Sequence, residues 1–207
     1  MKPIISSTIA ITTLLALTAC SDPADQTTDA AVTEAAPIAT ATATAGSTYQ
    51  FTPASTIGFV GSKVTGSHDG GFKDFTGYFI VESGNPVAGE FTIVMDSIWS
   101  DSENLTGHLK APDFFDVENH PTAKFEVSAF TKKSETEYEL SGNLTLRGTT
   151  KNITFPTQVA VDGQSVHVTA EFDINRQDFG VAYPGKKDDL IRDAVIIKFD
   201  LMAEPRA

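Results

Sequence analysis

The feature that most constrains this chain is a series of short segments, from Tyr49 onward, in which apolar and polar residues alternate. Alternation with period two places one kind of side chain on each face of a β-strand. In the last segment, for example, Ile197 and Phe199 share one face, and Lys198 and Asp200 share the other. The predicted strands span 49–64, 77–81, 89–96, 122–130, 138–146, 151–161, 165–174 and 194–203.

Short polar stretches between these segments predict tight turns. Gly and Asn occur in SGNP (83–86), RGTT (147–150) and VDGQ (161–164), and both residue types suit turn conformations. One apolar face per strand fits an antiparallel sheet with water on its other face. Because no long helical pattern is present to cover the apolar face, the strands must close into a barrel or stack as a sandwich.

One short helix is predicted between the third and fourth strands, in SDSENLTGHLKAPDFF (100–115). Asp101 or Ser102 would cap its N-terminus, and Pro112 would follow its end. A closed eight-stranded barrel is either filled by its own side chains or able to hold one small ligand. Periodicity alone leaves that choice open.

Composition excludes several classes of function. The net charge of −12 argues against nucleic acid and against electrostatic docking on anionic lipid. The single Cys and the four scattered His offer neither an internal disulfide nor a spacing typical of a metal site. No GxSxG motif occurs, so we predict no catalytic residues, no metal and no cofactor.

The N-terminal segment predicts export and a lipid anchor. Residues 1–19 carry a short positive start and an apolar run, IISSTIAITTLLAL, which is too short to span a bilayer comfortably. The sequence LTAC (17–20) resembles the bacterial lipobox, in which the Cys thiol receives acyl chains such as palmitate and the peptide is cut before it. This predicts a signal peptide over 1–19 and lipidation of Cys20; the alternative is a chance Cys in an ordinary signal sequence. Two or three acyl chains anchor a protein stably.

The residue after Cys20 is Ser21 rather than Asp. By resemblance to Gram-negative lipoproteins, this favours the outer membrane, with the protein facing the periplasm. Residues 20–47 are rich in Ala, Thr, Asp and Pro and contain no Lys or Arg. We expect them to form a disordered tether with a span of about 30 Å, with a weak Ala-rich helix as the alternative. The folded domain is then 48–207.

Several longer segments resemble the signature segments of the YceI-like family. They are GGFKDFTGYF (70–79), GHLKAPDFFDVENHPTAKFE (107–126), LSGNLTLRGTTKNITFP (140–156) and NRQDFGV (175–181). The resemblance runs from about Tyr49 to Glu204 and implies a lipocalin-like, eight-stranded antiparallel β-barrel with an elongated apolar pocket. It also implies a periplasmic or secreted protein that binds isoprenoid chains, such as polyprenyl quinone-like molecules, or other long amphiphiles. The chain departs from the family pattern at Thr106 and Gly107, where an Arg-Asp pair commonly precedes the His-Leu.

Burying an isoprenoid chain requires many apolar side chains and few polar groups. The candidate lining residues are Phe125, Val127, Leu144, Leu146, Phe155, Val168, Phe172, Ile174, Ile197 and Phe199. Taken singly, each also fits an ordinary core. At the mouth, His108, Arg176 and Tyr183 could bond a quinone or hydroxyl oxygen, although Arg176 could instead pair with Asp178 as a structural clip.

The leading expectation is therefore a lipid-anchored periplasmic protein that holds an isoprenoid or similar amphiphile, for storage, transport or stress protection. The alternative is a structural or stress-related envelope lipoprotein with a side-chain-filled barrel and no ligand. A weaker third reading is a cofactor-assisted enzyme that acts on the bound lipid. The sequence leaves a homodimer open.

Overall fold

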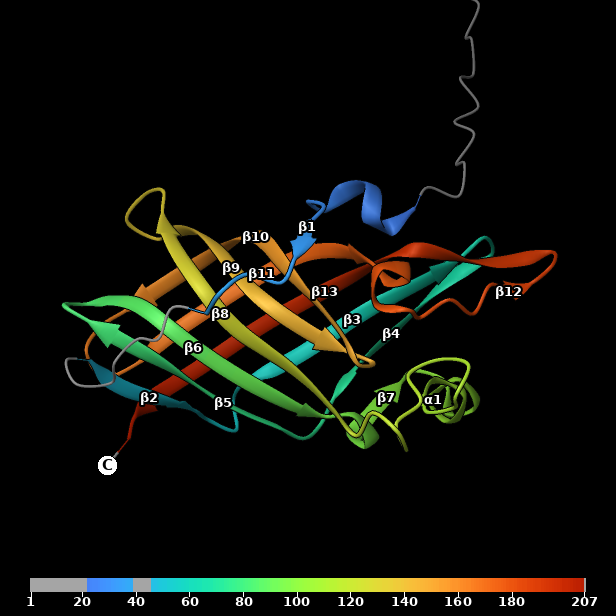
Figure 1. Ribbon diagram of the computed structural model, residues 1–207, viewed down its shortest axis with the longest axis horizontal. Helices are drawn as coiled ribbons and strands as arrows, with labels where there is room; N and C mark the ends of the chain where they lie inside the picture. The colour runs from blue at the N-terminus through green and yellow to red at the C-terminus, as the bar shows by residue number, and fades with distance from the viewer. Residues whose placement is uncertain (1–21, 39–45, 207) are drawn as a thin grey trace, which may run out of the picture.

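The computed structural model describes residues 22–38 and 46–206. The predicted signal peptide and Cys20 lie outside the described residues. The strands form a closed, eight-stranded antiparallel barrel, with α1 and β12 at one end and the turn between β5 and β6 at the other (Figure 1). The strands are β1 (Ala31–Glu34), β2 (Ser47–Phe51), β3 (Thr56–Lys63), β4 (Gly66–Phe72), β5 (Phe75–Glu82), β6 (Asn85–Val94), β7 (Ile98–Ser100), β8 (Thr122–Lys132), β9 (Glu137–Leu146), β10 (Thr149–Val161), β11 (Val166–Asn175), β12 (Gly185–Lys186) and β13 (Asp189–Pro205).

The ring runs β13–β2–β5–β6–β8–β9–β10–β11 and returns to β13. Each of the eight predicted strands falls on this ring, so the prediction of an eight-stranded antiparallel barrel is confirmed. The first predicted strand is broken into β2 and β3, which pair with successive parts of β13. Beyond the ring, β3 pairs with β4 and β4 with β7, which extends the sheet at one end of the barrel.

Tight turns of the predicted kind connect neighbouring strands. Ser83 and Gly84 have φ of 50° and 76° between β5 and β6, and Arg147 and Gly148 have φ of 49° and 74° between β9 and β10. Two successive residues with positive φ form the two-residue hairpin loop whose twist matches the twist of the strands. These turns fix the register of both hairpins.

The predicted helix between the third and fourth strands is present as α1 (Glu103–Leu109). Ser102 caps it, since its side chain accepts a hydrogen bond from the amide of Leu105 at 3.4 Å. Three 3₁₀ turns complete the structure: η1 (Pro23–Gln26), η2 (Met95–Ser97) and η3 (Arg176–Phe179). Within the described part of the chain, no helix is long and apolar enough to cross a membrane.

The prediction of a disordered tether over 20–47 is wrong for residues 22–38, which pack on the barrel. β10 and β11 pair only from Gln158 and Thr169 toward their shared turn, and they diverge at the other end. β1 lies in this gap: it pairs antiparallel with β10 on one side, and on the other the amide of Ala30 donates to the carbonyl of Asp173 in β11 at 2.9 Å. The segment orders because it satisfies backbone groups that the diverging strands leave unpaired.

Candidate ligand-binding cavity

The barrel encloses a cavity of about 470 Å³ at the end where α1 lies. Most of its wall comes from β3, β6, β8, β9, β11 and β13, whose inward-facing residues are mostly aliphatic or aromatic, and α1, β4, β10 and β12 also contribute to it. Water-filled voids hold about 30 Å³ per molecule, and small-molecule sites measure about 300–1,000 Å³. The cavity therefore has the size and lining of a site for an apolar ligand.

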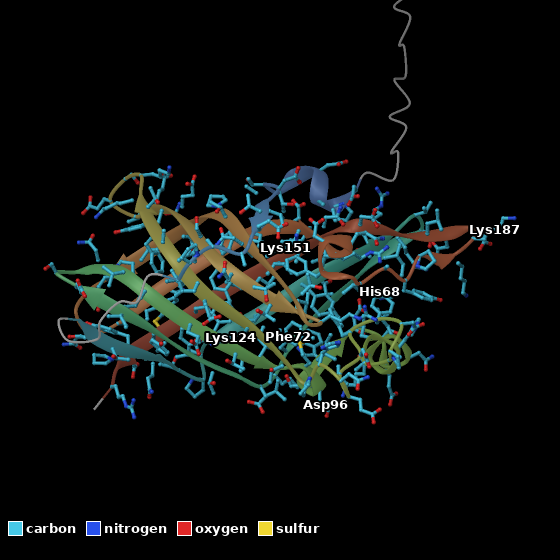
Figure 2. The ribbon with its side chains drawn as sticks, viewed as in Figure 1. His68, Phe72, Asp96, Lys124, Lys151 and Lys187 are labelled. Atoms are coloured by element: carbon cyan, nitrogen blue, oxygen red, sulfur yellow. The ribbon has the colours of Figure 1, made fainter. Side chains whose placement is uncertain are left out.

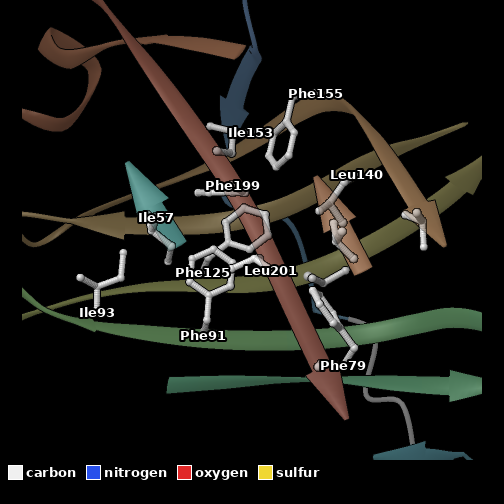
Figure 3. Close-up of a cluster of buried hydrophobic side chains, with 14 of the residues drawn as sticks. Ile57, Phe79, Phe91, Ile93, Phe125, Leu140, Ile153, Phe155, Phe199 and Leu201 are labelled. Atoms are coloured by element: carbon white, nitrogen blue, oxygen red, sulfur yellow. The ribbon is translucent and has the colours of Figure 1, made fainter. Parts of the chain in front are cut away.

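Phenylalanine rings form the floor of the cavity. Phe91 stacks on Phe125 with ring centroids 5.1 Å apart, and Phe199 meets Phe91 and Phe172 edge-on at 5.4 and 5.6 Å. All four line the cavity. In Figure 3, Ile57 and Ile93 lie on one side of this group of rings, and Phe79 and Leu140 on the other. The rings thus separate the hollow half of the barrel from a half packed with side chains.

The structure places seven of the ten predicted apolar residues in the wall of the cavity. They are Phe125, Leu144, Leu146, Phe172, Ile174, Ile197 and Phe199. The remaining three, Val127, Phe155 and Val168, are not in the wall. They are at most 2% exposed and belong to the packed half, where Phe155 stacks on Phe172 at 3.8 Å. They were predicted as lining residues because apolar and polar residues alternate in the same way in both halves of the barrel.

The three predicted polar residues all border the cavity. His108 lies edge-on to the rings of Tyr183 and Phe114, at 4.7 and 5.1 Å between centroids. Phe114 comes from the PDFF stretch after α1, and Tyr183 comes from the segment between η3 and β12. The mouth of the barrel is therefore built by two loops that meet at these rings.

Arg176 acts as a structural clip, but its partner is not the predicted Asp178. Its guanidinium donates to the carbonyls of Val181, Ile191 and Arg192 at 2.5, 3.3 and 3.0 Å, and to the Asp193 carboxylate at 3.1 Å. Burial lowers the pKa of Arg176, while the charge of Asp193 opposes that shift. Because its donors bond Val181 in the mouth loop and residues of β13, Arg176 positions the mouth more than it offers a contact to a ligand.

Two histidines at the mouth are each bonded to an aspartate. His68 Nδ1 lies 2.7 Å from Asp101 Oδ1, and His108 Nε2 lies 3.0 Å from Asp113 Oδ2. The hydrogen bond from the histidine is the main cause that lowers the pKa of each aspartate. Because one ring nitrogen is held by a carboxylate, each histidine can present its other nitrogen to a polar head group.

Several lining residues were missed by sequence reasoning, among them Phe59 on β3 and Phe72 on β4. The Phe59 ring lines the cavity and lies against Gly70, where an added Cβ would stand 2.2 Å from a ring atom. A Cβ added at Gly71 would stand 2.7 Å from the carbonyl oxygen of Ile57. The glycines of β4 therefore allow close approach of Phe59, but a glycine-rich strand shows no alternation that a sequence could reveal.

Trp99 lies on β7 with 38% of its surface exposed and is not in the wall of the cavity. Across the residues that the structure describes, no group of three or more His, Cys, Asp or Glu side chains is arranged to hold a metal ion. The chemistry available at the cavity is therefore burial of an apolar chain, with histidine, lysine and tyrosine groups at the mouth.

Comparison with known proteins supports the fold and the family. A UPF0312 protein of Pseudomonas putida (strain W619) is 33% identical over 124 residues, which cover 56% of this chain and 65% of that protein. A UPF0312 protein of Pectobacterium atrosepticum is 34% identical over 96 residues, covering 45% of this chain and 50% of the relative. The matched part of this chain thus spans less than two thirds of either relative.

Among solved structures, Burkholderia cenocepacia BcnA is similar with a TM-score of 0.66 and 26% identity, covering 72% of this chain and 96% of BcnA. A polyisoprenoid-binding domain from Saccharophagus degradans, implicated in plant cell wall breakdown, has a TM-score of 0.64 and 16% identity, covering 78% and 99% of the two chains. The model of the YceI-like domain matches residues 49–203. The chain belongs to the YceI-like family.

Proposed function

We propose that this protein is a lipid-anchored binding protein of the bacterial cell envelope. It holds an isoprenoid chain, such as a polyprenyl quinone, or a similar long-chain amphiphile in its barrel, for storage, transport or stress protection. The observation that carries the proposal is the apolar cavity of about 470 Å³ with histidines at its mouth. A similar fold in a polyisoprenoid-binding domain adds support.

The cavity also weighs against the side-chain-filled barrel. That alternative requires no space beyond a few water molecules, at about 30 Å³ each. Only the half of the barrel beyond the phenylalanine floor is filled, by residues such as Phe79, Leu140 and Leu201, each at most 2% exposed. Empty apolar space in the other half lowers stability through lost packing, so a ligand that fills it would stabilise the fold.

Lipidation of Cys20 and an outer-membrane location facing the periplasm belong to the same proposal. They rest on the lipobox-like sequence LTAC and on Ser21. An anchor would keep the cavity close to the bilayer in which isoprenoids dissolve. The bound lipid and the acyl chains of the anchor would then belong to the same membrane.

Titration of the purified, delipidated protein with an isoprenoid quinone tests the binding proposal. Native mass spectrometry should show one quinone per barrel, and the melting temperature should rise with quinone concentration because the ligand binds the folded state. A long-chain fatty acid in parallel separates isoprenoid binding from general lipid binding. Neither mass addition nor thermal stabilisation by either lipid would contradict the proposal.

A further inference from the structure

The N-terminal end of the described chain is fixed beside the mouth of the barrel. The Asp22 carboxylate accepts a hydrogen bond from Arg192 Nη1 at 3.0 Å and from Ser62 Oγ at 3.5 Å, and it caps η1 through the amide of Ala24 at 3.1 Å. Ser62 lines the cavity and lies on β3, while Arg192 lies on β13. Asp22, the first residue that the structure describes, is therefore held near the cavity.

Just beyond these contacts, an exposed apolar pair stands at the ends of the same two strands, with Val64 directly after β3 and Leu190 near the start of β13. Val64 follows Ser62 by two residues and is 51% exposed; Leu190 precedes Arg192 by two residues and is 50% exposed. The amide of Val64 donates to the carbonyl of Leu190 at 3.2 Å, which places the two residues side by side. Few large apolar residues in the described chain are this exposed, and two adjacent ones are unusual on a water-facing surface.

Two exposed lysines and an exposed aspartate, Asp188, lie on the loop before Leu190. Lys186 and Lys187 are exposed on the loop at β12, and Lys187 marks the extreme end of the molecule (Figure 2). Lys63 is paired with Asp189, whose pKa is lowered mainly by that hydrogen bond. We call Val64, Leu190, Lys186 and Lys187 the mouth tip. Exposed apolar side chains beside lysines suit the boundary between lipid head groups and acyl chains.

We propose that the mouth tip docks on the phospholipid bilayer and that the anchor at Cys20 holds it there. Cys20 precedes Asp22 by two residues, so their Cα atoms are at most about 7 Å apart. Val64 follows Ser62 by two residues, so their Cα atoms are likewise at most about 7 Å apart. An acylated Cys20 would therefore enter the membrane close to the mouth tip, and the anchor would orient the cavity toward the lipid.

This inference rests on the proposed lipidation of Cys20. The described residues 22–38 pack on the barrel, so they do not act as the expected long tether between the anchor and the domain. The anchor matters because the net charge of −12 opposes attraction to anionic lipid. With the anchor in place, docking requires only the modest favourable free energy of burying the Val64 and Leu190 side chains in the bilayer. A zwitterionic surface is then sufficient, and the lysines of the mouth tip contact its phosphates.

Site-directed spin labelling of the full, acylated chain tests docking. Because Cys20 is the only cysteine and acylation occupies its thiol, Val64→Cys or Leu190→Cys supplies one site for a nitroxide label. After reconstitution into phosphatidylcholine vesicles, labels at 64 and 190 should be accessible to oxygen and protected from an aqueous nickel chelate. The matched control is Val94→Cys, at a 38% exposed valine on β6, and its label should stay accessible to nickel.

One matched pair of variants tests the contact that holds Asp22, and a single variant tests the apolar pair. Asp22→Asn keeps an acceptor for the η1 cap but removes the charge that pairs with Arg192, so nickel protection at position 190 should fall. Asp25→Asn, at an exposed residue of the same turn, should leave protection unchanged. Val64→Asp should reduce the docked-to-undocked ratio, read from a label at 190, by roughly tenfold or more, the order expected for losing burial of one valine side chain.

Docking is overturned if labels at 64 and 190 are as accessible to nickel as the label at 94. It is also overturned if mass spectrometry finds no acyl chain on Cys20, or if Asp22→Asn behaves as Asp25→Asn. Quinone uptake by a Cys20→Ser protein in solution tests the cavity alone. Uptake without docking contradicts only the docking inference, and docking without uptake contradicts only the proposed ligand.

Discussion

At the scale of single residues, the effect of a substitution on the free energy of unfolding depends on whether the side chain is packed against others or faces the cavity. Ile197 is half-buried and faces the cavity, whereas Val127 is 2% exposed and lies in the packed half. Both were predicted as ligand contacts from the same alternation. Packing density, which a single sequence does not display, separates them.

Ile197→Phe should block ligand uptake while changing the free energy of unfolding of the empty protein by less than about 1 kcal/mol, because the larger ring enters empty space. The matched variant Val127→Phe has no such space and should cost about 1–3 kcal/mol through overpacking. Chemical denaturation and quinone titration of both proteins check this. Equal destabilisation by the two variants would show that the cavity is not open at Ile197.

Asp173 makes the attachment of the N-terminal segment sensitive to pH. Its side chain accepts a hydrogen bond from Thr27 at 2.7 Å, and it is only 3% exposed. Burial is the main cause that raises the pKa of Asp173, and the nearby charges of Asp29 and Asp22 add to it. The folded protein therefore holds the Asp173 proton more tightly than the unfolded chain does.

A raised carboxyl pKa favours the folded state below the ordinary pKa of Asp, and this contribution is lost as pH rises through the folded pKa. Asp173→Asn mimics the protonated form and should be stabilising at about pH 7 but neutral at about pH 4. Thermal unfolding at both pH values checks the sign, with exposed Asp178→Asn as the control. An Asp173→Asn protein that is destabilised at neutral pH would contradict this assignment.

At the scale of elements, the loops at the mouth depend on Arg176, which is 5% exposed and bonds to three carbonyls. Arg176→Met should cost about 2–4 kcal/mol, because it leaves buried acceptors unsatisfied. Limited proteolysis should then cut the 182–189 segment faster. The control Lys198→Met breaks a surface pair with Glu171 at 3.4 Å and should cost less than about 1 kcal/mol. Equal costs would show that Arg176 does not hold the mouth.

β1 is a short strand that fills the gap between the diverging ends of β10 and β11. Because Ala30 donates toward β11, the amides of Ala31 and Thr33 point the other way, toward β10. Thr33→Pro removes one of these donors and should cost about 1–3 kcal/mol. Hydrogen exchange at β10 residues 151–154 should accelerate, whereas Thr33→Ala, which keeps the amide, should leave it unchanged. Unaltered exchange in Thr33→Pro would contradict the pairing.

Elements with an apolar face of their own were predictable from sequence, and elements that lack one were not. The eight ring strands alternate clearly, and the Ser102 cap marks α1. β1 reads AVTE within an Ala- and Thr-rich stretch, and β4 reads GSHDGGF. Both form because neighbouring strands offer unpaired backbone groups, which is a property of the assembled sheet and not of their own sequence.

At the scale of the whole molecule, the barrel is divided by its phenylalanine floor into a packed half and a hollow half. The segments that resemble the YceI-like family include both the GHLKAPDFF stretch and the NRQDFGV stretch, which build the mouth. Sequence therefore located the mouth and part of the cavity wall. The volume of the cavity and the fixed position of Asp22 follow from three-dimensional packing, and sequence did not reveal them.

The central claim is that the hollow half holds an isoprenoid or a similar long-chain lipid. The most direct test is to purify the full chain from bacterial membranes, extract it with organic solvent and identify the lipids by mass spectrometry, beside Ile197→Phe prepared in the same way. We predict about one long-chain isoprenoid or amphiphile per wild-type barrel and much less in Ile197→Phe. Wild-type protein that repeatedly yields no such lipid, or only as much as Ile197→Phe, would contradict the account.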